Sequence, residues 1–151
     1  MTLRIRRAEP PDAGAIAEIL VGSREANPDT IPAMVHTRPE VLEWVSSVVV
    51  PHREGWVACT GEVIVGVLVL HDHMIDQFYI LPSRTGQGIG AALVAHAKRL
   101  RPDRLELWTF QSNLGARRFY ARHGFTEVER TDGSGNEERA PDVRLLWPAD
   151  F

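Results

Sequence analysis

The segment 78–93, FYILPSRTGQGIGAAL, constrains the fold more than any other part of the chain. It joins a short aromatic and β-branched run to a glycine-rich turn and then to an amphipathic helix. Glycines at 86, 88 and 90 have no Cβ, which lets a ligand approach the backbone closely. The first amides of the helix lack partners within the helix and lie at the positive end of its dipole. The segment is therefore typical of a phosphate site, although a tight strand–helix corner has the same pattern.

Two common phosphate-binding patterns do not fit this loop. The run Gly86-Gln87-Gly88-Ile89-Gly90 lacks the Gly-Lys-Ser/Thr ending of nucleoside triphosphatases. Ala91 stands where dinucleotide-binding enzymes carry their third glycine, and no acidic ribose ligand follows on a strand about 20 residues later. Another α/β nucleotide-binding protein is therefore disfavoured.

The rest of the chain alternates strand and helix signals around this loop. We expect strands over 3–6, 55–60, 63–70, 74–80, 104–110, 126–131 and 143–147, and helices beginning near residues 13, 39, 89 and 113. The first helix is expected to end at Gly22-Ser23, and Pro51 leaves the end of the second open. This order predicts an α+β fold: a mixed, mostly antiparallel sheet of about seven strands, flanked by about four helices.

Length and composition narrow the class of protein. The 151 residues indicate a single domain over 1–151, and 44% hydrophobic with 25% charged residues is typical of a soluble globular protein. A net charge of −3 offers no basic excess for nucleic acid, and the longest apolar run, 63–70, is far shorter than the roughly 20 residues that span a membrane. With Cys59 as its single cysteine, we expect a cytoplasmic protein. An exposed sheet edge would permit a homodimer.

A second segment, 105–125 (LELWTFQSNLGARRFYARHGF), makes the assignment sharper. Together the two segments resemble the GNAT superfamily of N-acetyltransferases, whose acetyl-CoA signature pairs a Q/R-x-x-G-x-G/A loop with an Asn…A-x-x-F-Y-x-x-x-G-F helix. The matching positions are Gly88, Gly90, Leu93, Asn113, Ala116, Phe119, Tyr120, Gly124 and Phe125. The joint match is specific, whereas each half alone is not. Thr85 departs from the pattern, because it occupies the Q/R position.

The resemblance implies an enzyme that moves an acetyl group from acetyl-CoA directly to a primary amine, with no metal. Asn113 would hydrogen-bond the pantetheine arm, and Tyr120 would act as the general acid that protonates the CoA thiolate. The remaining coenzyme-binding positions are the main chain of Phe78, Tyr79 and Ile80 for the pantetheine arm and the loop Thr85, Gly86, Gln87, Gly88, Ile89, Gly90 and Ala91 for the pyrophosphate. Asn113 also suits a helix N-cap, and Tyr120 also suits a core aromatic.

The general base is less clear from the sequence. Many family members carry a Glu five residues before the Asn, but Trp108 stands there in this chain. Asp76 is our first choice, because alternation along a strand places it on the face of Phe78 and Ile80. The other candidates are His73, Glu106, Glu137, Glu138 and Asp142. His71 and His73 have the spacing of a metal chelate but no third ligand nearby.

The acceptor is expected to be a cationic amine, either a small molecule or a peptide. Between residues 127 and 142 the chain carries six acidic residues against two basic ones, and such a rim would attract ammonium groups. We therefore expect Glu137, Glu138 and Asp142 to bind the substrate. The alternative is a catalytically weak CoA-binding sensor or partner module of the same fold, which Trp108 favours and Tyr120 opposes.

Overall fold

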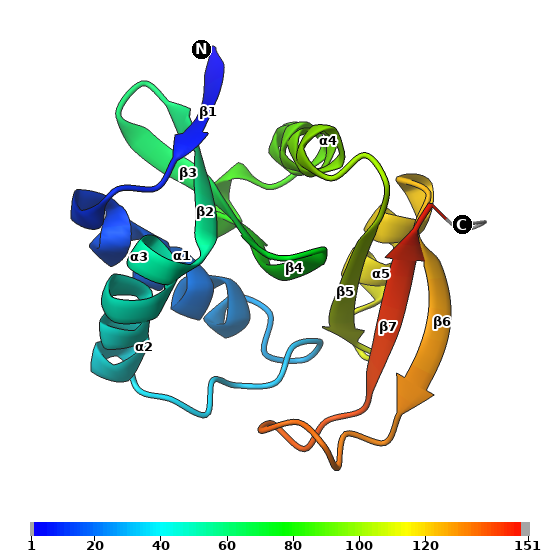
Figure 1. The fold of residues 1–151 in the computed structure, drawn as a ribbon. Coiled ribbons are helices and arrows are strands. Elements are labelled where there is room, and N and C mark those ends of the chain that lie inside the picture. Colours follow the sequence, from blue (N-terminus) through cyan, green and yellow to red (C-terminus); the bar gives the residue numbers. More distant parts are fainter. Residues whose placement is uncertain (1, 149–151) are drawn as a thin grey trace.

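Seven strands form one sheet in the computed structural model, which describes residues 2–148. The sheet order is β1-β2-β3-β4-β5-β7-β6, and only β4 and β5 run parallel (Figure 1). The strands are β1 Leu3–Arg7, β2 Glu54–Thr60, β3 Val63–His71, β4 Met74–Ile80, β5 Leu105–Phe110, β6 Thr126–Thr131 and β7 Asp142–Trp147.

Helices cover both faces of this sheet (Figure 1). The helices are α1 Ala13–Glu25, α2 Arg38–Trp44, α3 Val50–His52, α4 Ile89–Leu100 and α5 Leu114–Arg122. Helices α1 and α2 pack through Ile16 and Val41 on Val67 and Val69 of β3. On the other face, α4 and α5 pack through Leu93 and Tyr120 on residues such as Leu68 and Leu107. The predicted α+β fold, with its mostly antiparallel sheet, is confirmed.

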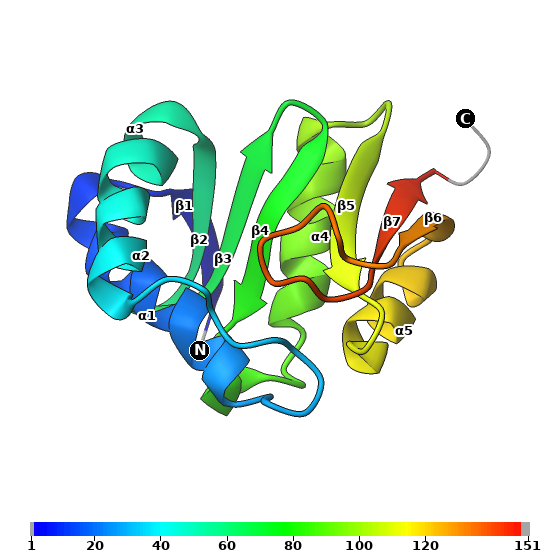
Figure 2. The same ribbon diagram turned by 90° about the horizontal axis from the view of Figure 1, so that it is seen from below.

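The feature that matters for function is the parting of β4 from β5. The two strands pair only at Met74 with Glu106 and at Ile75 with Leu107. Just after this contact, a β-bulge on β4 leaves Asp76 without a partner on β3. Beyond the bulge the strands separate, and the loop between β6 and β7 lies across the opening (Figure 2).

One helix end differs from the sequence expectation, and the structure defines another that the sequence left open. Helix α1 continues past Gly22 and Ser23 to Glu25, because the buried Ser23 hydroxyl donates to the Ile80 carbonyl over 3.2 Å and holds this turn on β4. Helix α2 ends at Trp44, but the chain stays helical through Pro51. Residues 45–49 wind as a π-helix, in which the Val50 amide donates to the Val45 carbonyl, and α3 follows directly. This wider turn leaves room for the Pro51 ring, which would clash in a regular α-turn.

Candidate active site

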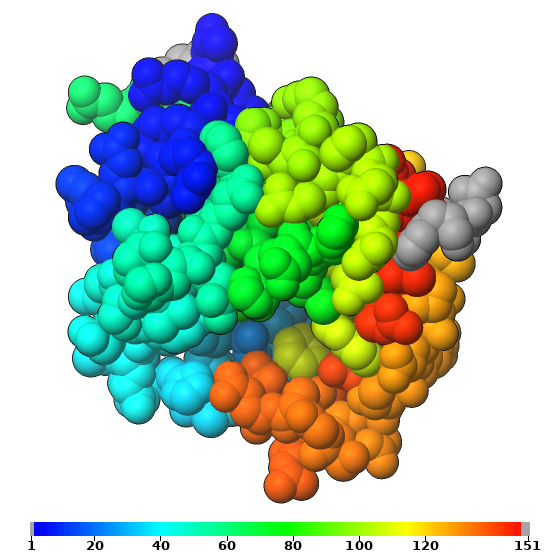
Figure 3. All heavy atoms as spheres, in the orientation of Figure 1, coloured from blue at the N-terminus to red at the C-terminus, as the bar shows by residue number. Residues whose placement is uncertain are grey.

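The opening between β4 and β5 leads into two adjoining clefts. The first, here called the loop cleft, has a volume of about 620 Å³ and lies against the glycine-rich turn. The second, the β5 cleft, has about 240 Å³ and lies against residues 107–110 and the β6–β7 loop. The hollow on this side is visible between the α1–α2 segment, β4 and β5, and the β6–β7 loop (Figure 3). The residues that border both clefts are Ile31, Phe78, Tyr79, Asn113, Ala116 and Tyr120.

Two glycines of the turn leave open room for a ligand. Gly86 and Gly88 have φ angles of +78° and +80°, and a Cβ on either would meet no atom within 4 Å. Gly90 has a different constraint, because a Cβ there would lie 3.1 Å from the Phe119 ring; its small size lets α4 pack against α5. Every predicted turn residue lines the loop cleft except Gln87, which is exposed. The free amides and open Cβ positions fit a pyrophosphate.

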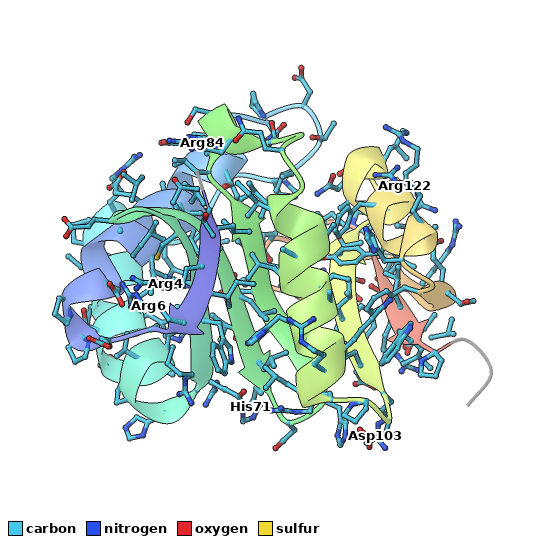
Figure 4. All side chains as sticks on the ribbon, turned by 90° about the horizontal axis from the view of Figure 1, so that it is seen from above. Arg4, Arg6, His71, Arg84, Asp103 and Arg122 are labelled. Atoms are coloured by element: carbon cyan, nitrogen blue, oxygen red, sulfur yellow. The ribbon has the colours of Figure 1, made fainter. Side chains whose placement is uncertain are left out.

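Two arginines that the sequence analysis did not single out also line the loop cleft. Arg84 follows β4 and donates to the Thr60 hydroxyl over 3.4 Å, and Arg122 ends α5. They lie on opposite sides of the N-terminal end of α4 (Figure 4). The cleft therefore has cationic side chains on both flanks, as a polyanion such as a nucleotide diphosphate requires.

The main chain of β4 presents free groups to the gap. Leu81 donates its amide to Val65 of β3, and successive residues of a strand point their amides to alternate sides. The amides of Phe78 and Ile80 therefore face away from β3, towards the gap. By the same alternation the Tyr79 amide points to β3, as that of Leu81 does, so Tyr79 contributes its side chain to the clefts rather than its main chain.

Tyr120 is both a core aromatic and a wall of the two clefts. Its ring packs between Phe78, Phe119 and Phe125, with centroid separations of 5.9, 5.3 and 5.4 Å. Burial raises the pKa of the Tyr120 hydroxyl well above its ordinary value, and Tyr79 adds to the increase. The phenol is therefore held in its protonated form, as a proton donor must be.

Asn113 caps helix α5. Its side-chain oxygen accepts the Ala116 amide over 3.1 Å, which leaves the side-chain NH₂ group available to donate into the clefts. The two uses that the sequence suggested for Asn113 are therefore compatible.

Asp76 lines the β5 cleft, but the reasoning that selected it needs correction. The bulge interrupts the alternation of β4, so Asp76 does not simply share a face with Phe78 and Ile80. The carboxylate is exposed at the mouth of the cleft, and partial desolvation by the surrounding walls raises its pKa although Arg53 and His71 act to lower it. A raised pKa makes Asp76 a stronger base than an ordinary surface carboxylate.

The other candidate bases separate clearly by position. His73 contacts Asp103 over 2.9 Å, and Glu106 lies 3.7 Å from Arg144; neither lines a described cleft.

Over residues 2–148, no three His, Cys, Asp or Glu side chains come together as a metal site. In the same range no helix has the length and apolar character to cross a membrane.

The two glutamates of the β6–β7 loop both have partners elsewhere in the chain. Glu138 lines the β5 cleft and accepts from Arg24 over 2.8 Å. Burial disfavours the charge on Arg24, but Tyr79 and Glu138 outweigh it and raise its pKa. Glu137 lies outside the β5 cleft and contacts His36 over 3.0 Å. Counting the acidic residues of the loop therefore gives a more negative charge than a ligand in the cleft would meet.

Asp142 lines the β5 cleft, and hydrogen bonds from β6 and from the β6–β7 loop hold its carboxylate in place. It accepts from the Thr131 hydroxyl and, over 3.1 Å, from the Asn136 amide. Trp108 borders the same cleft with 39% of its surface exposed, in place of a carboxylate.

The sequence analysis did not identify Arg24 as a residue of the site. The pattern that could have indicated it is a charged residue four positions after Leu20, which places a charge on the apolar face of α1.

A sheet parted at β4, a glycine turn that opens a helix and a buried tyrosine between two clefts define an acyl-CoA-dependent transferase. Comparison with known proteins agrees: the model of the acetyltransferase (GNAT) family matches residues 15–125, and the chain belongs to that family. It is an acetyl-CoA-dependent acyltransferase.

Three relatives are informative. Peptidyl-lysine N-acetyltransferase YjaB of Salmonella typhimurium is 31% identical over 149 residues, which are 98% of this chain and all of that protein. The solution structure of apo-form YjaB from Escherichia coli matches with a TM-score of 0.79 at 27% identity, covering 97% of this chain and 98% of that one. An amino-acid acetyltransferase of Mycobacterium tuberculosis is 30% identical over 139 residues, covering 84% of this chain and 70% of that protein.

Proposed function

We propose that this enzyme acetylates the side-chain amine of a lysine within a peptide or protein, with Tyr120 as the general acid. The observation that carries the proposal is the position of Tyr120, which borders both the loop cleft and the β5 cleft. A thioester carbonyl at this junction would have the coenzyme on one side and the acceptor on the other. The similarity to a peptidyl-lysine N-acetyltransferase over 98% of the chain supports lysine as the acceptor.

In this proposal the loop cleft binds acetyl-CoA. The turn from Thr85 to Ala91 holds the pyrophosphate, with Arg84 and Arg122 on either side. The gap-facing amides of Phe78 and Ile80 pair with the pantetheine arm as a neighbouring strand would, and the Asn113 side chain donates to it. This arrangement directs the acetyl group towards the β5 cleft.

The transfer then needs two proton movements. The neutral lysine nitrogen attacks the thioester carbon, and a C–N bond forms. The tetrahedral intermediate collapses with cleavage of the C–S bond, and the departing thiolate takes the Tyr120 proton. Asp76, directly or through water, takes the proton that the nitrogen loses.

The carboxylates of the β5 cleft suit a cationic acceptor. Asp76, Glu138 and Asp142 contribute three negative charges against one positive charge from Arg24. The exposed ring of Trp108 adds an aromatic surface, to which ammonium groups bind favourably. Glu137 would act outside this cleft, on the approach of the substrate.

A free amino acid is the second candidate acceptor. The similarity to an amino-acid acetyltransferase favours it, and the Arg24 guanidinium in the β5 cleft would suit an α-carboxylate. The two candidates differ in which nitrogen is acetylated. Purified enzyme with acetyl-CoA should acetylate the ε-amine of Nα-blocked lysine peptides, as mass spectrometry of the products would show. Acetylation of α-amines alone would overturn the lysine proposal.

A further inference from the structure

A third cavity, here called the α2 groove, adjoins the β5 cleft. Its volume is about 770 Å³, and it runs between α1, the α1–α2 loop and α2. Arg24 and Gln77 line both the groove and the β5 cleft, so the two cavities meet at these side chains. The groove takes no part in the chemistry proposed above. A ligand that ends in the β5 cleft can nevertheless extend into it.

The floor of the groove is apolar. Leu20 and Val41 are almost completely buried, and Met34 and Trp44 are partly buried against the same core. A free amino acid placed in the β5 cleft has no group that would reach this floor. A side chain from a longer acceptor would gain by burying its apolar surface there.

The rim of the groove is acidic. Glu40, Glu43 and Glu137 line it together with His36, which contacts Glu137 over 3.0 Å. Glu40 and Glu43 are exposed, and they carry the acidic character of the rim. The amide of Thr37 lowers the pKa of Glu40, so this carboxylate stays charged. The opposing Arg24 charge is matched by Glu138, since the two side chains are only 12% and 9% exposed and lie 2.8 Å apart. The free charge of the rim is therefore negative.

We propose that the α2 groove binds the peptide that flanks the target lysine, with one apolar side chain on its floor and a basic residue at its rim. This rests on the proposed function, and it adds a sequence preference that the β5 cleft alone does not provide. The occupant follows from two properties of the groove: it lies beside the cleft that takes the lysine, and its charge is opposite to that of a basic segment.

The test is a positional scan of Nα-blocked lysine peptides with acetyl-CoA. Against an Ala/Gly background, Leu is placed at each flanking position, alone and beside Arg. We expect one position at which Leu raises kcat/KM about 10-fold, as burial of one apolar side chain allows, and at which Arg raises it further. Equal kcat/KM for all peptides would overturn the inference and leave lysine acetylation standing. Absence of acetylation in every lysine peptide would overturn both.

Variants then locate the preference. Met34→Ala should reduce kcat/KM more for the Leu-containing peptide than for Nα-acetyl-lysine amide, whereas Val35→Ala, an exposed neighbour outside the groove, should not alter their ratio. Glu43→Gln should remove the advantage of Arg, and Glu62→Gln in the β2–β3 turn should retain it. A preference that survives both groove variants would overturn the assignment. So would a dimer that buries the groove, detected by sedimentation and abolished by Met34→Ala.

Discussion

Arg24 donates to Glu138 over 2.8 Å, and this contact joins helix α1 to the β6–β7 loop across 114 residues of sequence. Both side chains are largely buried, so removing one leaves the other charge without its partner. We expect Glu138→Gln to lower the free energy of unfolding by about 2–3 kcal/mol, and Arg24→Met with Glu138→Leu to recover most of it. Urea denaturation would measure this. Equal stabilities of Glu138→Gln and wild type would show that the pair does not hold the loop.

Gly88→Ala should weaken acetyl-CoA binding, because a Cβ there enters the open room beside the turn and the residue has a φ of +80°. The matched control is Gly61→Ala in the β2–β3 turn, where φ is +62° and the backbone penalty is similar. Isothermal titration should give a higher Kd for Gly88→Ala only. If both variants bind acetyl-CoA as the wild type does, the pyrophosphate lies elsewhere.

Tyr120→Phe keeps the aromatic packing and removes only the acidic proton. We expect kcat to fall about 100-fold while the Kd for acetyl-CoA stays within about twofold. Tyr79→Phe, which alters the other tyrosine bordering both clefts, is the comparison. A loss confined to Tyr79→Phe would reassign the proton donor.

Asp76 should produce the acidic limb of the pH–rate profile. Its raised pKa means that the carboxylate becomes protonated at a higher pH than the ordinary value of 3.8. Activity should therefore fall as the pH drops towards that raised value, and Asp76→Asn should be slow and lack this limb. An unchanged profile in Asp76→Asn would leave the proton to water.

The same shift fixes the sign of the stability effect of Asp76. A carboxyl whose pKa is raised by folding opposes folding when it is ionised, and the opposition vanishes below the unfolded value of 3.8. Asp76→Asn should therefore raise Tm at neutral pH, and the gain should fade as the pH falls from the raised pKa of Asp76 to 3.8. Thermal melts across this range provide the check.

Arg122 should recognise phosphate on the coenzyme. Arg122→Gln is expected to raise KM about fivefold for acetyl-CoA, as loss of an exposed charge contact allows. The control is Arg4→Gln on β1, which lines neither cleft. Acetyl-dephospho-CoA, which lacks the 3′-phosphate, shows which phosphate Arg122 contacts. If the KM for this analogue is the same in wild type and in Arg122→Gln, Arg122 contacts the 3′-phosphate. An unchanged KM for both coenzymes would remove Arg122 from the site.

Local sequence pattern was enough for the strands, because alternation and turn residues specify them directly. The 126–131 strand has the predicted bounds, and the 74–80 strand does too. The bulge at Asp76 was not predictable, since it depends on how β4 pairs with β3. The continuation of α1 through Ser23 was missed for the same kind of reason: the contact that holds it, to Ile80, comes from a distant strand.

The candidate site divides in the same way. The glycine turn and the Asn–Tyr helix are short motifs, so the sequence placed these residues in one region. The partner of Glu138 could not be read from the loop, because Arg24 belongs to another helix. The sequence analysis therefore counted the charges of the loop alone, without the Arg24 charge that lies beside Glu138.

The parting of β4 from β5 has a consequence for how freely this enzyme can diversify. Groups of the backbone cannot be removed by substitution, except where proline deletes an amide. If the pantetheine arm pairs with the Phe78 and Ile80 amides, most side-chain changes along β4 leave coenzyme recognition intact. The proposed acceptor side has no such protection, because Asp76, Trp108 and Glu138 line the β5 cleft and would act through their side chains. Mutation can therefore change the amine that is modified while the acyl donor stays the same.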